Sequence, residues 1–147
     1  MSNRFFEQIG GRPALEKINR IFYDKVFAHP WLSQYFVDIG QDTIESQQTD
    51  FLQSTFGGPR VYCGRLPVPA HQHIYITEEL FDLRSSLLEE SLREYGLDEK
   101  LIVHWMKIDG AFRSVLVKKS ASECRKRYNT DRIKDYPDPG AARKKPA

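Results

Sequence analysis

Apolar residues recur along the chain at intervals of three and four positions, which is the spacing of one face of an α-helix. The clearest example begins at Arg12-Pro13, where proline suits a first helical turn, and ends at Pro30. Its apolar positions are Leu15, Ile18, Phe22 and Val26. No stretch shows the strict alternation of a half-buried strand or the signal of a hairpin turn. The sequence therefore predicts an all-α fold.

A second helix is predicted between the first and a glycine-rich break. Asp42, followed by Glu45, resembles a capping box, and the helix should continue to about Thr55. The face expected to point inward carries Ile44, Gln48, Phe51, Leu52 and Thr55. Gln48 is the polar member of this stripe, and a buried amide needs hydrogen-bond partners. Gln48 therefore either turns outward or faces a polar group inside the protein.

Cap residues predict two more helices. Thr77 is a suitable N-cap before two glutamates, and Gly96 is a suitable C-cap for the same helix. Asp98 can cap the last helix. The inward positions expected on these two helices are Leu80, Phe81, Leu87, Leu88, Leu92, Leu101, Ile102, Trp105, Ile108, Phe112, Val115 and Leu116. Shorter elements are expected at residues 1–9, as a first helix, and at residues 31–37, as an aromatic corner.

A long passage without a clear period separates the second helix from Thr77. Gly57-Gly58-Pro59 stops the preceding helix, and Pro67 and Pro69 should hold the following segment extended. Long loops in compact domains are usually functional or disordered. This one ends on His71 close to apolar residues. His71 fits either a metal ligand or a histidine satisfied by a hydrogen bond near a helix start.

The composition favours a single domain with a basic extension. The chain has 147 residues, 40% of them hydrophobic, and a net charge of +2, which is too balanced to indicate a nucleic-acid partner. The apolar period fades after Val117, while prolines and basic residues accumulate. We therefore expect a domain over residues 1–120 and a mobile tail over residues 121–147. The tail is either a docking arm for acidic surfaces or a solubilising extension.

The cysteines and the hydropathy favour a cytoplasmic protein. Cys63 and Cys124 lie far apart and lack the spacing of a metal site, which indicates reduced thiols. The N-terminus lacks an apolar secretion core. No apolar run approaches the length of about 18 residues that a membrane span needs.

Several short stretches together resemble the truncated haemoglobins, the short globin family with a two-over-two helical sandwich around haem. The resemblance covers roughly residues 4–117. Its stretches are Ile9-Gly10-Gly11, the run from Phe22 to Leu32, Tyr35-Phe36, Gln47-Gln48 with Phe51, Phe56-Gly57-Gly58-Pro59 with Tyr62 and Gly64, and His71 six residues before Thr77.

The resemblance assigns roles to five of these side chains. His71 resembles the proximal ligand of haem iron. Tyr23 and Gln48 resemble the distal tyrosine and glutamine, Phe36 the phenylalanine that stacks on haem, and Ile44 the residue nearest the ligand entrance. The tyrosine hydroxyl and the glutamine amide can both donate hydrogen bonds to O2, which carries partial negative charge when it is bound. This pair resembles the first group of the family.

Four further residues complete the predicted haem-binding set. Phe51 and Phe81 lie on apolar stripes, and Tyr62 lies in the long loop. His73 competes with His71 as iron ligand, but residues two apart on a helix do not share a face. The family spacing to Thr77 selects His71. His73 is then a candidate neighbour of a haem propionate, and the other candidates are Arg60, Tyr62 and Arg65.

Two positions depart from the expected pattern. Arg84 stands where an apolar haem-pocket residue is expected, so it either turns outward or reaches a propionate. Gln47 occupies a place where some truncated haemoglobins have a lysine or histidine that can bind iron. Gln47 and Ile44 are poor iron ligands, which predicts a five-coordinate iron with an open sixth position. The expected cofactor is haem b, and the expected ligands are O2, NO, CO or similar molecules.

Four functions are compatible with these residues. The resemblance permits an enzyme that oxidises nitric oxide with O2, and such an enzyme would need an external electron donor because the sequence contains no reductase domain. The others are a binder that stores or carries a ligand, a gas sensor that docks a partner, and a helical interaction module without haem.

Overall fold

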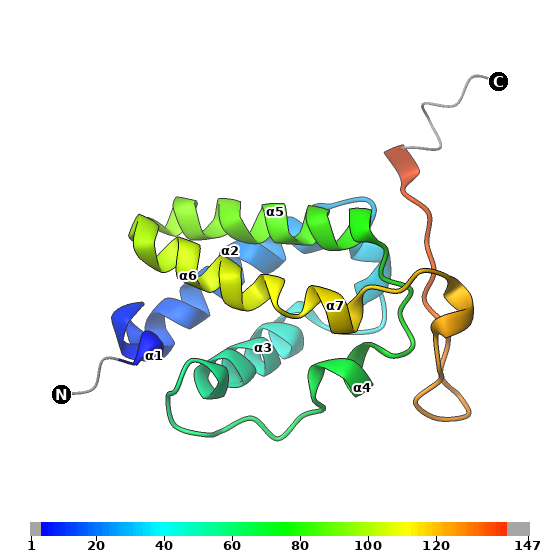
Figure 1. Cartoon of the computed structure of the whole chain (residues 1–147), viewed down its shortest axis with the longest axis horizontal. Helices are drawn as coiled ribbons and strands as arrows, with labels where there is room; N and C mark the ends of the chain where they lie inside the picture. The colour runs from blue at the N-terminus through cyan, green and yellow to red at the C-terminus, as the bar shows by residue number, and fades with distance from the viewer. Residues whose placement is uncertain (1–3, 141–147) are drawn as a thin grey trace.

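Four long helices carry the fold in the computed structural model, which describes residues 4–140 (Figure 1). They are α2 (Gly11–Ala28), α3 (Gln41–Thr55), α5 (Glu78–Tyr95) and α6 (Glu99–Gly110). Shorter elements connect them: α1 (Phe5–Gln8), the 3-10 helix η1 (Leu32–Phe36), α4 (Pro67–His71), α7 (Arg113–Leu116) and the 3-10 helix η2 (Ala121–Glu123). No strand occurs between residues 4 and 140, which confirms the all-α prediction. Residues 1–3 of the predicted first helix lie outside the described residues.

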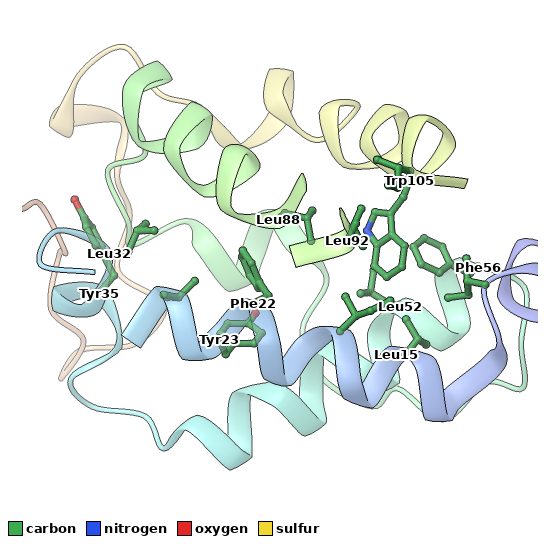
Figure 2. Packing of buried hydrophobic residues seen from close by; sticks show 14 of the residues in the cluster. Leu15, Phe22, Tyr23, Leu32, Tyr35, Leu52, Phe56, Leu88, Leu92 and Trp105 are labelled. Carbon is green, nitrogen blue, oxygen red and sulfur yellow. The ribbon is translucent and has the colours of Figure 1, made fainter. Parts of the chain in front are cut away.

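The long helices form two packed pairs, α2 with α3 and α5 with α6. Helix α2 also packs against α5, which joins the two pairs. Their shared core includes the fully buried residues Leu15, Ile18, Leu92 and Trp105, several of which meet in Figure 2. No helix in residues 4–140 is both long and apolar enough to cross a membrane.

The predicted caps of α5 and α6 are confirmed. The Thr77 hydroxyl accepts a hydrogen bond from the Leu80 amide, and the Asp98 carboxylate accepts one from the Lys100 amide. Gly96 follows α5 with a φ of 90°, the left-handed conformation that glycine adopts without strain. These caps depend on residues that are adjacent in sequence, and local signals of this kind are the ones that a sequence pattern reports directly.

The predicted start and inward face of α3 need correction. The helix begins at Gln41 and makes no side-chain cap, because Asp42 and Glu45 are instead paired with Arg20 of α2. The buried positions of α3 are Glu45, Thr49, Leu52 and Gln53. Thr55 is exposed, whereas Ile44, Gln48 and Phe51 are half-buried on the adjoining face. A polar face of α3 therefore packs on α2, and a second face with Gln48 stays available for a site.

Two further expectations are wrong in detail. Pro67 and Pro69 do not hold the chain extended but lie within the first turns of α4, where the missing proline amide costs nothing. The last predicted helix is interrupted after Gly110, so that α6 and α7 are separate. As a consequence Val115, predicted to point inward, is 54% exposed.

The described part of the tail, residues 121–140, packs on the domain. Lys134 is buried, and its ammonium donates to the Tyr35 carbonyl at 2.8 Å and the Asp38 carboxylate at 2.7 Å. The Tyr136 carbonyl accepts hydrogen bonds from the Trp31 indole at 2.7 Å and the Tyr35 hydroxyl at 3.1 Å. These contacts argue against a tail that is mobile throughout. Residues 141–147 lie outside the described residues, and the domain boundary at residue 120 stays a prediction.

Candidate functional site

Tyr23 lies in an aromatic cluster between α2 and η1. Its ring centroid is 6.1 Å from that of Phe36 and 6.5 Å from that of Phe27, and the Phe27 and Phe36 rings are 5.4 Å apart. Tyr23 also packs edge-on against Phe22, its neighbour on α2, as Figure 2 shows. The structure therefore brings together Tyr23 and Phe36, the residues predicted for the distal hydrogen bond and for stacking on haem.

The Tyr23 hydroxyl is a donor on a buried side chain, and it has no acceptor among the described residues. The side chain is 6% exposed, yet its hydroxyl makes no hydrogen bond within residues 4–140. Burial raises the pKa of Tyr23 to about 12, with Arg84 acting in the opposite direction. The phenol consequently stays protonated at neutral pH, and its hydrogen is available to a bound ligand.

The half-buried face of α3 supplies the other predicted pocket residues. Ile44, Gln48 and Phe51 follow one another at helical spacing, and no described residue forms a hydrogen bond with the Gln48 amide. The Phe51 ring packs against Tyr62 at 5.3 Å and Phe112 at 6.3 Å. This places two predicted residues, Phe51 and Tyr62, side by side. The Tyr62 hydroxyl is engaged by the Arg65 carbonyl, which does not favour its predicted role beside a propionate.

His71 is the last residue of α4, and its ring is held in one orientation. Its Nδ1 lies 2.7 Å from the Pro67 carbonyl oxygen, so Nδ1 carries the proton and Nε2 keeps its lone pair. Burial lowers the pKa of His71, opposed by that hydrogen bond, and this favours the neutral ring. A neutral imidazole whose other nitrogen donates to a backbone carbonyl is the usual form of a metal-ligating histidine. The residues fit a haem iron at Nε2.

His73 is placed differently, beneath the tail. It is 3% exposed, its buried Nδ1 has no hydrogen-bond partner within residues 4–140, and its carbonyl accepts from the Lys134 amide at 2.8 Å. Burial, together with the charge of Arg127, lowers the pKa of His73 to about 4. The ring is therefore neutral and covered by protein, which does not favour the predicted role beside a propionate.

Arg84 does not simply turn outward but forms an ion pair with the buried Asp109, and its own side chain is 32% exposed. Its two terminal nitrogens lie 2.9 Å and 2.8 Å from the carboxylate oxygens of Asp109 on α6. The guanidinium lies 5.7 Å from the ring centroids of Phe22 and of Phe81, the buried residue predicted to bind haem. Asp109 was not predicted as part of the site. The sequence did contain a signal for this pair, because Arg84 and Asp109 each place a charge in the apolar stripe of their own helix.

Replacing Arg84 with leucine is expected to destabilise the protein, because Asp109 would remain buried without its cation. We expect a loss of about 2 kcal/mol in the free energy of unfolding, or a drop in melting temperature of roughly 4–8 °C, measured by thermal denaturation. The matched control is Arg93→Leu on the same helix, because Arg93 pairs with Glu99 at the surface and should matter little. Adding Asp109→Leu to Arg84→Leu should recover much of the loss. Equal effects of Arg84→Leu and Arg93→Leu would contradict the role of the pair.

A family model described as bacterial-like globin matches residues 4–116. Among similar proteins, a group 1 truncated haemoglobin of Tetrahymena thermophila is 32% identical over 97 residues, which are 66% of this chain and 80% of the relative. This agrees with the predicted likeness to the first group.

Two solved structures show the same arrangement of helices. The truncated haemoglobin of Tetrahymena pyriformis in its Fe(III) form superposes with a TM-score of 0.74 at 29% identity, over 80% of this chain and 100% of that one. A 2/2 haemoglobin of Synechococcus, described with covalently attached haem, gives 0.70 at 28% identity, over 76% and 94%. The predicted two-over-two helical sandwich is confirmed.

Proposed function

The chain belongs to the bacterial-like globin family, as a truncated haemoglobin, and from that premise we propose that it is a cytoplasmic haem protein that reversibly binds O2 and other small diatomic ligands. The observation that supports this most directly is the orientation of His71. Its Nδ1 donates to the Pro67 carbonyl, which leaves Nε2 as the only ring nitrogen able to bind iron.

Each of the candidate pocket residues would have a separate role in binding haem or its ligand. Haem b, held by His71, would supply an iron that binds O2, NO or CO. The Tyr23 hydroxyl and the Gln48 amide would donate hydrogen bonds to that ligand. Phe36 and Phe81 would pack on the macrocycle, and Ile44 would line the entrance. Gln47 and Ile44 are poor iron ligands, so they would leave the iron free to bind a small molecule.

Two donors that hold O2 favour a reaction over rapid release. The second candidate function is therefore the oxidation of nitric oxide to nitrate, in which NO, O2 and one electron give one nitrate ion. The electron would be supplied by an electron donor. Storage and gas sensing are the alternatives, and both predict that nitrate formation stops once the iron has given up its single electron.

Absorption spectra of the purified protein test the main proposal. The ferric, ferrous and CO-bound forms should each show a strong haem band, with a five-coordinate spectrum in the ferrous form. A purified chain that takes up no haem would refute the proposal and favour a helical interaction module. Supplying nitric oxide, O2 and a chemical reductant and measuring nitrate then separates the enzyme, which forms many nitrate ions per haem, from a storage protein or a sensor, which stops after its iron is oxidised.

A further inference from the structure

Residues 118–136 form a clasp on the segment that carries His71. Lys118 donates from its ammonium to the carbonyls of His71 at 3.1 Å and Ile74 at 2.7 Å, and from its amide to the Ile76 carbonyl at 2.8 Å. The Arg125 amide donates to the Gln72 carbonyl at 2.7 Å, and the Lys134 amide donates to the His73 carbonyl at 2.8 Å. Most carbonyls of residues 71–76 thus depend on this clasp.

Near its C-terminal end, the clasp also forms hydrogen bonds with another part of the domain. Through its ammonium Lys134 holds the Tyr35 carbonyl and the Asp38 carboxylate, and the hydrogen bond from Lys134 lowers the pKa of Asp38. Its carbonyl accepts from the Tyr75 amide at 2.8 Å. Lys134 therefore connects η1 and the residues just after it with the residues after α4. Figure 1 shows the tail beside both connections, at the end of the molecule where α5 begins.

The segment that the clasp covers has little other support. Helix α4 has five residues, and a single turn is marginal by itself because few hydrogen bonds offset the cost of nucleation. Its described packing is against α7, another short helix. The family model ends at residue 116, before the clasp begins. The clasp is therefore an addition to the matched domain, attached where the candidate iron ligand lies.

We propose that the clasp positions His71 for iron and that Lys134 is its anchor. The proposal rests on the proposed function, because it assumes haem at His71 Nε2. Lys134 is a positioning residue, since it touches the His71 segment and not the ligand. With the anchor in place, the backbone of residues 71–76 has one position. The imidazole of His71 would then be presented to the iron in one orientation. Without it, the segment moves and haem is held less tightly.

The test compares Lys134→Met with Lys126→Met in the full chain. Lys126 lies in the same segment, but its ammonium makes no hydrogen bond among the described residues, which makes it the matched control. We expect Lys134→Met to speed haem transfer to apomyoglobin about tenfold, because two charge-assisted hydrogen bonds are lost. We also expect a shifted or broadened iron–histidine stretching band in the resonance Raman spectrum of the ferrous form. Lys134→Arg should recover part of both effects.

Three results separate the outcomes. If the wild type takes up no haem, the proposed function fails and the clasp proposal fails with it. If the wild type holds haem but Lys134→Met matches Lys126→Met in transfer rate and Raman band, the clasp proposal alone is wrong. A lower melting temperature with an unchanged Raman band would likewise overturn it, since Lys134 would then be merely structural. Should Lys134→Met not fold, the milder Asp38→Asn decides by the same two measurements, with smaller expected changes.

Discussion

Replacing His71 with alanine is expected to abolish stable haem binding. The change removes the only protein bond predicted for the iron, and the remaining pocket contacts are apolar or are hydrogen bonds to the ligand. The short helix α4 should remain, because the Pro67 carbonyl lies at its first turn and can bond to water instead. The measurement is the ratio of haem to protein after purification, together with the spectra of the ferrous and CO-bound forms.

His73 provides the matched control for this experiment. It is a histidine two residues away, but its ring is buried beneath the tail, and its Nδ1 has no hydrogen-bond partner in the part of the chain that the structure describes. His73→Leu fills similar space and removes that unsatisfied polar group, so folding should tolerate the change. We expect this variant to retain a normal five-coordinate ferrous spectrum. If His73→Leu lost haem while His71→Ala kept it, the assignment of the iron ligand would be reversed.

The parts of the fold that were predictable depend on neighbouring residues. Thr77, Gly96 and Asp98 act on backbone groups within a few positions, so their effects appear in the sequence as fixed spacings. The inward face of α3 was not predictable in the same way. Its apolar residues suggested one face, but Arg12 and Asn19 of α2 draw Gln53 and Thr49 into the interior. The inward face of α3 therefore depends on its contacts with α2, and the pattern of α3 alone does not show these contacts.

The tail shows a second limit. Its contacts with residues 71–76 are hydrogen bonds that end mainly on backbone carbonyls, and several are donated by backbone amides, which almost every residue has. A buried lysine at position 134 has no apolar period around it, and its acceptors lie almost one hundred positions earlier in the chain. The candidate site was predicted from the resemblance to truncated haemoglobins, because Gln48 and His71 by themselves left ordinary structural roles open and nothing in its own position singled out Tyr23. Their geometry still needed the structure, which alone shows the hydrogen bond that leaves Nε2 of His71 available.

The distal pair can be tested by comparing O2 with CO. Tyr23→Phe should speed O2 release about tenfold to a hundredfold, because a hydrogen bond to a charged acceptor contributes roughly 1.5–3 kcal/mol. CO is less polar when bound and should be released at a rate closer to that of the wild type. Gln48→Leu should act in the same direction, whereas Gln47→Leu, an exposed neighbour on the same helix, should change neither rate. Stopped-flow displacement measures all of these rates.

The double variant reveals whether the two donors share one ligand. Tyr23 and Gln48 lie on different helices, and neither side chain makes a hydrogen bond to another described residue. If both donate to the same O2 molecule, Tyr23→Phe with Gln48→Leu should fall short of the sum of the single effects, since residues that share a partner are coupled. Strict additivity would mean that they act separately. Equal acceleration of O2 and CO release would instead assign Tyr23 a steric role, and an unchanged O2 rate would remove the hydrogen-bond explanation together with the argument for nitric oxide oxidation.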